Sequence, residues 1–196
     1  MKRFFDIIFS LGGIVILSPF FILIWFLIKM DSEGSPIFKQ TRVGKHNKDF
    51  TLFKFRTMYV SGSSGTAITL SNRDPRITRI GFILRKYKLD ELPQLFNVFF
   101  GDMSFVGPRP ELRSFVSKYN EEQLKVLNVK PGITDYASIK YFNESEILGR
   151  SQNPEYDYIH QIMPEKLKLN LEYISNNSTY KDLKIILLTI KKIFFH

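Results

Sequence analysis

The sequence predicts a mostly helical α+β fold that combines an N-terminal membrane helix, a small β-hairpin and amphipathic surface helices. Three observations indicate this fold class. Residues 7–28 contain no charged side chain, two short alternating segments flank a polar loop at residues 44–48, and several later segments carry apolar residues at helical spacing. We therefore expect a re-entrant membrane helix over residues 1–30 and a second domain over residues 31–196.

The composition narrows the function. The 196 residues carry a net charge of +9, which suits nucleic acid, an anionic membrane surface or phosphorylated substrates. The chain has no cysteine, so disulfides and thiol catalysis are excluded. Its three histidines are scattered and form no metal-ligand spacing.

The apolar run is long enough to cross a bilayer core of about 30 Å. Ser18-Pro19 lies in its middle, where a proline removes a helical hydrogen bond and bends the helix. Basic residues flank both ends, Lys2 and Arg3 before the run and Lys29 after it, so the positive-inside rule selects no orientation for a crossing. A re-entrant helix broken at Ser18-Pro19 satisfies both observations, and a kinked single-pass helix is the open alternative.

Residues 37–44 and 50–58 predict the two strands of a hairpin. In the second strand, Lys54 and Arg56 alternate onto one face, and together with Arg42 they form a small basic surface. This surface suits contacts to phosphate, and a solvated strand face explains it equally well.

Residues 60–75 are rich in Ser, Gly and Thr and predict a mobile loop. A helix follows, with Thr78 as its expected N-cap, and ends near Arg85, five residues before Asp90. Arg85 either lies beside the acidic pair or balances the dipole at the helix C-terminus.

Asp90 and Glu91 are adjacent carboxylates at the expected start of the next helix, with Asp90 at the N-cap and Pro93 in the first turn. Neighbouring side chains on a helix point in different directions, so the pair suits two different tasks. One carboxylate can attack phosphorus while the other holds Mg²⁺. The helix dipole would favour the ionised form of Asp90. Ordinary helix capping is the competing interpretation.

A Gly- and Pro-rich turn follows at residues 101–110 and holds Arg109 between Pro108 and Pro110. The two prolines restrict the backbone on both sides, so this arginine is arranged in advance to bind a phosphate or stack on a flat base. A rigid surface loop with a solvated arginine is the alternative. Asp102 either caps the turn or joins the metal site.

The remaining segments predict helices. The apolar helix after Asp90 contacts either the membrane interface or the core, and residues 111–128 predict short helices. Residues 155–174 predict a helix restarted at Pro164. Residues 180–196 predict a basic amphipathic helix that either lies on an anionic membrane or packs on the core.

The segments Leu89-Asp90-Glu91-Leu92-Pro93-Gln94 and Gly101-Asp102-Met103-Ser104-Phe105-Val106-Gly107-Pro108-Arg109-Pro110 resemble the bacterial sugar transferase family, the monotopic phosphoglycosyl transferases. The resemblance extends over nearly the whole chain. It implies that a sugar 1-phosphate moves from a UDP-sugar to a polyprenyl phosphate such as undecaprenyl phosphate, with release of UMP. It also implies a bacterial inner membrane location, with a catalytic domain at the cytoplasmic face and a start of glycan assembly there.

The resemblance also implies residue roles. Asp90 is the nucleophile that forms a covalent phosphosugar intermediate, and Glu91 coordinates Mg²⁺. Arg109 with its flanking prolines contacts the nucleotide, and the phosphate contacts are assigned to Lys54, Arg56 and Arg85. Asp102 is part of the family motif and is assigned to the substrate site beside the metal. The chain departs from the family at Phe142, where an arginine is common, which leaves one phosphate contact unassigned. The sugar, the pathway product and the oligomeric state are not predicted.

Two other classes of function stay open on the residues alone. A membrane-anchored binding protein could use the basic face to dock on lipid or on a partner. A nucleic-acid binder would explain the net charge, but the sequence carries no recognisable motif for it and the apolar segment argues against it. We therefore expect no nucleic-acid partner. Sugar transfer without phosphate is a weaker enzymatic alternative.

Overall fold

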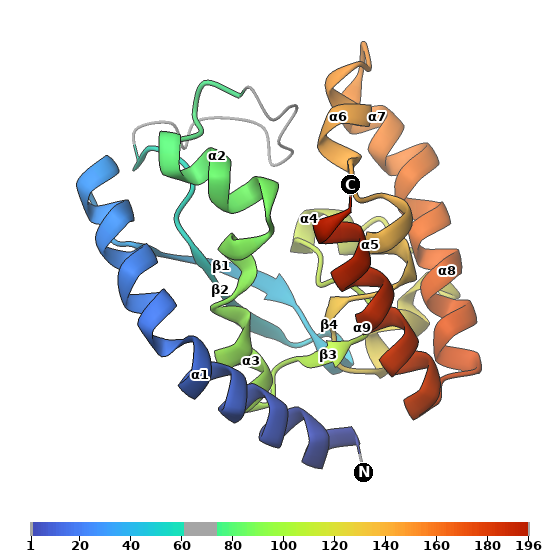
Figure 1. Cartoon of the computed structure of the whole chain (residues 1–196). Helices are drawn as coiled ribbons and strands as arrows, with labels where there is room; N and C mark the ends of the chain where they lie inside the picture. Colours follow the sequence, from blue (N-terminus) through green and yellow to red (C-terminus); the bar gives the residue numbers. More distant parts are fainter. Residues whose placement is uncertain (1, 61–73, 196) are drawn as a thin grey trace.

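The computed structural model describes residues 2–60 and 74–195, so the loop predicted at residues 60–75 lies almost entirely outside the described residues. Figure 1 shows two groups of elements that meet at a short parallel strand pair. The first group contains α1 (Lys2–Asp31), β1 (Ile37–Val43), β2 (Asp49–Phe55), α2 (Arg79–Lys86), η3 (Leu89–Glu91) and α3 (Gln94–Phe100). The predicted α+β class, mostly helical with small sheets, is confirmed.

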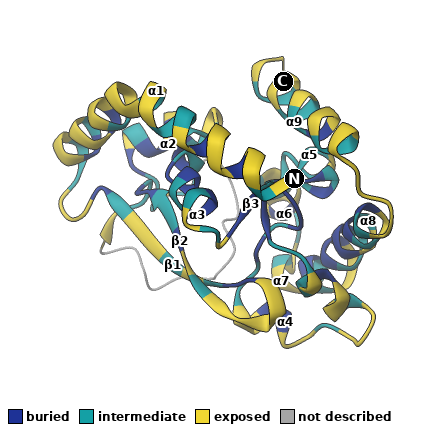
Figure 2. Ribbon diagram, turned by 90° about the horizontal axis from the view of Figure 1, so that it is seen from below, coloured by how far each residue is buried: buried dark blue, intermediate teal, exposed yellow. Residues whose placement is uncertain are grey.

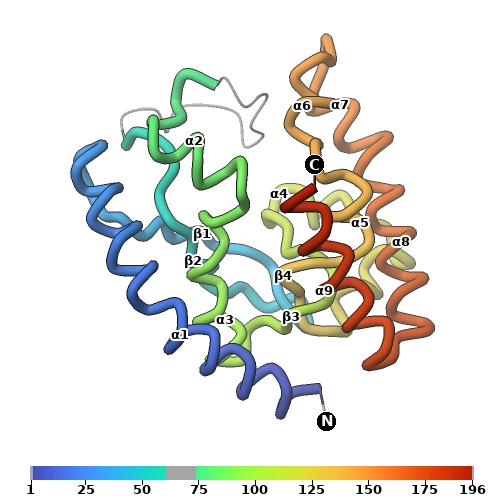
Figure 3. Tube along the Cα trace, viewed as in Figure 1, coloured from blue at the N-terminus to red at the C-terminus, as the bar shows by residue number. Residues whose placement is uncertain are grey.

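The second group is almost entirely helical. It contains α4 (Arg113–Val116), η4 (Gln123–Asn128), α5 (Tyr136–Lys140), α6 (Glu144–Gly149), α7 (Pro154–Asp157), the π-helical turn η5 (Tyr158–Ile162), α8 (Met163–Ser175) and α9 (Thr179–Phe194). Pro164 lies in the first turn of α8, as predicted, because a proline has no N–H to leave unpaired there. The trace in Figure 3 shows α9 returning across the group to lie beside β3 and α5.

The predicted hairpin is confirmed. Strands β1 and β2 pair antiparallel, from Ile37 opposite Phe55 to Val43 opposite Asp49. Leu52 and Phe55 are the buried residues of β2, and they pack on different clusters, Leu52 near α3 and Phe55 between α1 and α2. The hairpin therefore ties the long helix to the rest of the first group.

Helix α1 continues through Ser18-Pro19, so the predicted break in the helix at this point is wrong. Pro19 has no N–H to donate to the carbonyl of Val15, four residues earlier. The hydroxyl of Ser18 donates to that carbonyl oxygen instead, at 2.8 Å. Because the orphaned acceptor is satisfied locally, the helix does not have to end at the proline.

The burial of the N-terminal half of α1 is inverted relative to a water-soluble helix. Its buried residues there are the polar Asp6 and Ser10, whereas Phe9 is more than half exposed. The C-terminal half buries Ile24 and Ile28 in an apolar cluster. Figure 2 shows this exposed outer surface along the helix. By length and composition alone, α1 could cross a membrane. Apolar side chains outside and polar side chains inside are the pattern expected where lipid replaces water.

Both ends of α1 are fixed to the same domain. Near its start, Arg3 donates to the carbonyls of Val98 and Phe99, and Asp6 accepts from the Ser104 hydroxyl at 3.0 Å. Near its end, the Asp31 carboxylate accepts from the Ile80 N–H at 3.0 Å. The helix therefore lies along the domain rather than standing away from it.

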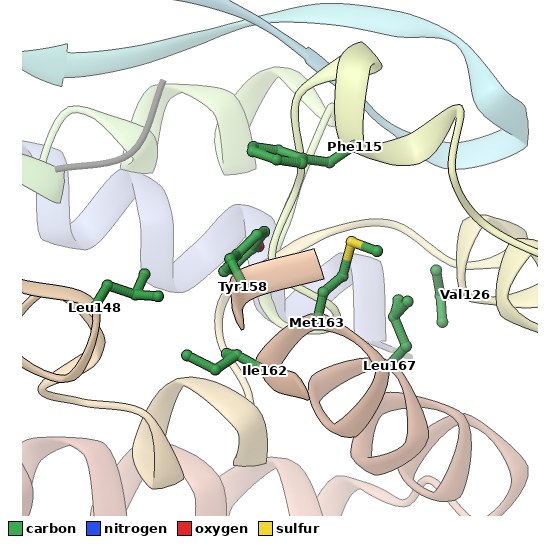
Figure 4. Close-up of a cluster of buried hydrophobic side chains, with 7 residues drawn as sticks. All are labelled: Phe115, Val126, Leu148, Tyr158, Ile162, Met163 and Leu167. Atoms are coloured by element: carbon green, nitrogen blue, oxygen red, sulfur yellow. The ribbon is translucent and has the colours of Figure 1, made fainter. Parts of the chain in front are cut away.

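The main apolar core lies in the second group, where α4, η4 and α8 converge. Figure 4 shows its buried side chains, with Phe115 and Tyr158 packed edge to face at 4.9 Å between ring centroids. The cluster consists of Phe115, Val126, Leu148, Tyr158, Ile162, Met163 and Leu167. This core holds the segment that follows the Gly- and Pro-rich turn.

Strands β3 (Ser104–Val106) and β4 (Gly132–Thr134) pair in parallel and join the two groups. Gly107 and Gly132 approach so closely that a Cβ on Gly132 would lie 2.1 Å from the Gly107 nitrogen. Only glycine fits at this crossing. The contact fixes the start of the turn that carries Arg109.

The amphipathic helices are confirmed in outline. Helix α3 buries Leu95 and Val98 and exposes Phe100, so one face serves the core and one end reaches solvent or lipid. Helix α9 buries Ile185 and exposes a stripe at helical spacing that consists of Tyr180, Leu183, Leu187, Ile190 and Phe194. This outer stripe is not used by the core.

Candidate active site

The acidic pair lies in η3, a single 3₁₀ turn between α2 and α3. Lys88 precedes it with φ 55° and ψ 20°, a left-handed conformation that reverses the chain after α2. Helix α3 begins only at Gln94, with Pro93 at the N-cap position. The prediction that Asp90 caps the following helix is therefore wrong, because the chain forms a separate turn first.

Glu91 is the centre of a partly buried ion-pair cluster. Its Oε1 accepts from Lys54 Nζ at 3.0 Å, and both of its oxygens accept from the Arg109 guanidinium, Oε2 at 3.2 Å. Burial opposes ionisation of this carboxyl, but Arg109 and Lys54 outweigh burial and hold the pKa of Glu91 well below its usual range. Glu91 is therefore a permanent anion in the folded protein.

Asp90 behaves in the opposite way. It is buried, and desolvation raises its pKa, with the neighbouring charge of Glu91 adding to the effect while Lys54 and Arg85 oppose it. The expectation that a helix dipole favours the ionised form is not met, because no long helix begins at this residue. A carboxylate whose pKa is raised by burial is a more basic oxygen nucleophile than an exposed one.

Arg109 is held rigidly from both sides. Its backbone N–H donates to the Asp135 carboxylate at 3.1 Å, and its guanidinium binds Glu91 as described. Pro108 and Pro110 are both buried. The close pairing with Glu91 raises the pKa of Arg109 further. The alternative of a solvated surface arginine is therefore excluded.

The structure does not bring all predicted residues to this site. Arg56 follows the end of β2 and turns away, donating to the carbonyls of Ser35 and Ser32 at 2.8 and 2.7 Å. It fastens the chain that leaves α1 and does not share a surface with Lys54, so the predicted basic face is wrong at this residue. The backbone reason is that the strand alternation stops at Phe55.

Asp102 also lies apart from the acidic pair. It is exposed beyond the C-terminal end of α3, whereas Asp90 and Glu91 precede the N-terminal end. Its carboxylate accepts only a long hydrogen bond, 3.4 Å, from the Asn97 amide. The structure therefore places Asp102 away from the acidic pair and shows no capping hydrogen bond from a backbone N–H to its carboxylate within the described residues.

Arg85 is where the sequence predicts it, in the last turn of α2. Its positive charge lowers the pKa of Asp90, which places it in the electrostatic surroundings of the pair. Burial lowers the pKa of Arg85 itself, and Asp90 and Asp74 act against that effect. Both sequence interpretations of Arg85 hold, since it lies at a helix end and beside the carboxylates.

Sequence reasoning missed a second buried charge cluster behind the turn. Lys166 of α8 bonds Glu144 at 2.8 Å and approaches Glu111 at 3.5 Å, and Tyr158 donates to Glu111 at 2.5 Å. Arg42 completes the cluster by donating to the Pro110 carbonyl at 3.2 Å. We call Arg42, Glu111, Glu144, Tyr158 and Lys166 the bracing cluster. No local sequence pattern predicts the bracing cluster, because its members come from five separate segments.

The acidic pair fits a divalent cation only in combination with a ligand. Within residues 2–60 and 74–195, no three side chains of metal-ligating type gather in one place. Mg²⁺ is usually held by one or two carboxylates together with substrate phosphates. Glu91 accepts three hydrogen bonds, and a carboxylate offers about four lone-pair positions, so one remains for a metal.

Comparison with known proteins agrees with the geometry. The profile of the family described as "Bacterial sugar transferase" matches residues 1–196. The chain is 39% identical over 201 residues to the "Undecaprenyl-phosphate glucose phosphotransferase" of Komagataeibacter xylinus, covering 99% of this chain and 36% of that protein. It is 36% identical over 196 residues to the "UDP-N-acetylgalactosamine-undecaprenyl-phosphate N-acetylgalactosaminephosphotransferase" of Aeromonas hydrophila, covering 98% and 43%.

A shorter relative matches over most of its own length. The "Exopolysaccharide production protein PSS" of Rhizobium leguminosarum bv. phaseoli is 39% identical over 198 residues, covering 97% of this chain and 93% of that protein. The chain spans well under half the length of the first two relatives. The family match nevertheless covers every residue, and on this evidence the chain belongs to the bacterial sugar transferase family.

Proposed function

We propose that this chain transfers a sugar 1-phosphate from a UDP-sugar to a polyprenyl phosphate, of which undecaprenyl phosphate is the type that relatives' names specify. The observation that carries the proposal is the adjacent pair of carboxylates, Asp90 buried and Glu91 bound by Lys54 and Arg109, whose pKa values move in opposite directions, Asp90 upward and Glu91 downward. Such a pair divides two tasks between neighbouring residues.

In the first half-reaction, a carboxylate oxygen of Asp90 attacks the phosphorus that carries the sugar. The bond from that phosphorus to the bridging oxygen breaks, and UMP leaves with the bridging oxygen. The product on the protein is a mixed anhydride between the Asp90 carboxyl and the sugar phosphate. Arg109, fixed at its backbone by Asp135, would bind the phosphate or the base of the nucleotide, and Lys54 and Arg85 would balance negative charge.

In the second half-reaction, a phosphate oxygen of the polyprenyl phosphate attacks the same phosphorus. The bond to Asp90 breaks and returns the free carboxylate, and the lipid carries a diphosphate-linked sugar. No water molecule enters either step. The burial of Asp90 serves this sequence, because it limits hydrolysis of the covalent intermediate.

Mg²⁺ is the cation we propose for this site. Glu91 would hold it through its remaining lone pair, together with the phosphates of the donor. When bound, the ion neutralises charge on the phosphate oxygens. Lys54 and Arg109 keep Glu91 ionised and oriented for this task, since both bind its carboxylate.

The proposed site of action is the cytoplasmic face of the bacterial inner membrane. Helix α1 would lie within one leaflet and keep both ends at the same face by bending at Pro19 without a break, with its exposed phenylalanines in lipid. Two observations support re-entry over crossing: both ends of α1 bind the same domain, and its buried side includes Asp6 and Ser10. The donor would arrive from water and the acceptor phosphate from the headgroup layer.

The test is a release assay with the whole chain in detergent. The protein is incubated with Mg²⁺, undecaprenyl phosphate and a panel that includes UDP-glucose, UDP-galactose and UDP-N-acetylgalactosamine. Release of UMP that requires the metal and Asp90 is the expected result. Release of UDP would mean transfer of the sugar without its phosphate and would overturn the role of Asp90.

A further inference from the structure

Three segments that are far apart in the sequence meet at the ring of Phe142, next to the turn that carries the acidic pair. Lys88 precedes η3, Phe142 lies in the turn between α5 and α6, and Lys192 lies near the end of α9. The ammonium of Lys88 lies 4.9 Å from the centroid of the Phe142 ring, and that of Lys192 lies 5.9 Å from it. The ring of Phe142 therefore contacts two ammonium groups. We call Lys88, Phe142 and Lys192 the lysine–phenylalanine cluster.

The cluster is electrostatically connected to the acidic pair. The charge of Lys88 lowers the pKa of both Asp90 and Glu91, so its ammonium acts on the site directly. Lys88 also adopts a left-handed backbone conformation with φ 55°, which is unfavourable for a lysine. Such conformations gather at functional sites, where the surroundings enforce them.

The two lysines differ from the other cations of the site in their partners. Lys54 and Arg109 both bind the carboxylate of Glu91. Among the residues that the structure describes, no carboxylate lies within salt-bridge distance of Lys88 or of Lys192. A contact with an aromatic face neutralises no charge, so both ammonium groups keep their attraction for an anion.

We propose that Lys88 and Lys192 bind the phosphate of the lipid acceptor, with Phe142 holding the two ammonium groups apart around it. This inference rests on the proposed function and names the residues that receive its second substrate. A phosphate monoester carries between one and two negative charges near neutral pH, in agreement with two cations. The phosphate would thereby lie next to the phosphorus bound to Asp90.

The position of the cluster favours the acceptor over the donor. Arg109 and Lys54 surround Glu91, where the nucleotide is proposed to bind. Helix α9, which carries Lys192, also exposes the apolar residues Leu183, Leu187 and Ile190. A long-chain phosphate ester can use both the cations and such an apolar surface, whereas a nucleotide or a free phosphate uses only the cations.

The decisive variant is Lys192→Gln, with Lys191→Gln as its matched control. Lys191 is the neighbouring exposed lysine on the same helix and makes no contact with the ring, so the two variants change net charge equally. We expect Lys192→Gln to raise the KM for the polyprenyl phosphate by about tenfold, the usual scale of one lost charged contact. The KM for the UDP-sugar and the release of UMP in a single turnover without acceptor should stay unchanged, and Lys191→Gln should behave as the wild type.

A second variant tests the other side of the cluster. Lys88→Asn keeps a residue type that tolerates the left-handed conformation, so it removes the charge without forcing the backbone to change. It should raise the KM for the acceptor in the same way. An acceptor KM within twofold of the wild-type value for both variants, or a rise confined to the KM for the donor, would overturn the proposal.

Binding without turnover separates this inference from the proposed function. Calorimetry would measure the affinity of the detergent-solubilised protein for farnesyl phosphate, inorganic phosphate and phosphatidylglycerol vesicles. The expected result is binding of farnesyl phosphate that Lys192→Gln weakens about tenfold, and much weaker binding of inorganic phosphate. If Lys192→Gln weakens only binding to the vesicles, the cluster binds membrane headgroups and the proposal fails. An absence of UMP release from the wild type would count against the proposed function alone.

Discussion

The protein contains two partly buried clusters of opposite charges that lie on either side of one rigid turn. The first is the dyad cluster, formed by Lys54, Asp90, Glu91 and Arg109, and the second is the bracing cluster. In the bracing cluster both carboxylates, Glu111 and Glu144, bind Lys166. In the dyad cluster the cations are concentrated on Glu91, and Asp90 has a raised pKa.

The difference shows how similar residues serve stability in one place and chemistry in another. A buried ion-pair network that satisfies all of its members fixes a conformation. A buried carboxylate whose pKa is raised by desolvation is a reactive group whose cost the rest of the fold must offset. The bracing cluster reaches the backbone of Pro110, so it holds the neighbouring Arg109 against Glu91.

The largest expected effect is that of Asp90→Asn. The amide cannot attack phosphorus, so turnover should fall by at least about 10⁴-fold. At neutral pH the midpoint of thermal unfolding should not decrease, because the substitution removes a buried charge. Activity assays and thermal unfolding of the same preparation check both statements. A variant with a tenth of the wild-type rate would leave Asp90 only an electrostatic role.

In the bracing cluster, a substitution should lower stability more than it lowers turnover. Lys166→Met leaves Glu111 and Glu144 without their shared cation and should lower the free energy of unfolding by about 3 kcal/mol. Denaturant unfolding in detergent measures the loss. Lys168→Met is the control, since Lys168 is exposed on the same helix and should cost less than about 0.5 kcal/mol. Equal stability of the two variants would show that the cluster braces nothing.

Glu91→Gln should weaken the response to Mg²⁺. Loss of one ligand charge should raise the Mg²⁺ concentration for half-maximal UMP release by about tenfold. A titration of activity with Mg²⁺ at saturating donor gives this value. An unchanged titration curve would remove Glu91 from the proposed metal site and leave it as the partner of Arg109 alone.

The two carboxylates should also give opposite dependences of stability on pH. Asp90 has a folded-state pKa above its ordinary value of 3.8, so the folded protein binds this proton more tightly than the unfolded chain does. Its contribution to stability is therefore complete below pH 3.8 and is lost as pH rises from 3.8 through the raised pKa. Glu91 has a folded-state pKa well below 4.5, so its contribution is present above that pH and is lost as pH falls. Unfolding of Asp90→Asn and Glu91→Gln across acid pH should show differences from the wild type of opposite slope. Equal slopes would contradict the assignment.

The smallest effect is expected for an exposed pair outside both clusters. Arg113 binds Asp49 at 2.5 Å, but the two side chains are 47% and 48% exposed. Arg113→Gln should change the free energy of unfolding by less than about 1 kcal/mol and leave turnover unchanged. Denaturant unfolding measures the change in stability, and the UMP release assay measures turnover. A loss comparable to that of Lys166→Met would mean that burial does not distinguish the clusters.

The sequence predicted those features that depend on neighbouring residues. The hairpin, the Thr78 N-cap and the fixed Arg109 followed from alternation, capping chemistry and paired prolines, and all three are confirmed. Predictions from local sequence patterns were wrong where the backbone left the expected strand or helix. The end of β2 redirected Arg56, and the 3₁₀ turn after Lys88 displaced Asp90 from the N-cap.

The remaining features depend on contacts between distant segments. The Ser18 hydroxyl that preserves α1 across Pro19 is local, yet the pattern of residues does not show which carbonyl it will bind. Lys166 and Glu111 are 55 positions apart, and Lys192 meets the ring of Phe142 only because α9 folds back over α5. No periodicity in one sequence reports such contacts.

The central claim is that Asp90 carries the sugar phosphate, and the most direct measurement is intact-protein mass spectrometry after incubation with Mg²⁺ and a UDP-sugar, without acceptor. The account predicts an increase in mass equal to one sugar phosphate, located on Asp90, with one UMP released per protein. The adduct should be absent from Asp90→Asn and should disappear on addition of undecaprenyl phosphate. UMP release that occurs only with the acceptor, and without any adduct, would show direct transfer between the substrates and contradict the account.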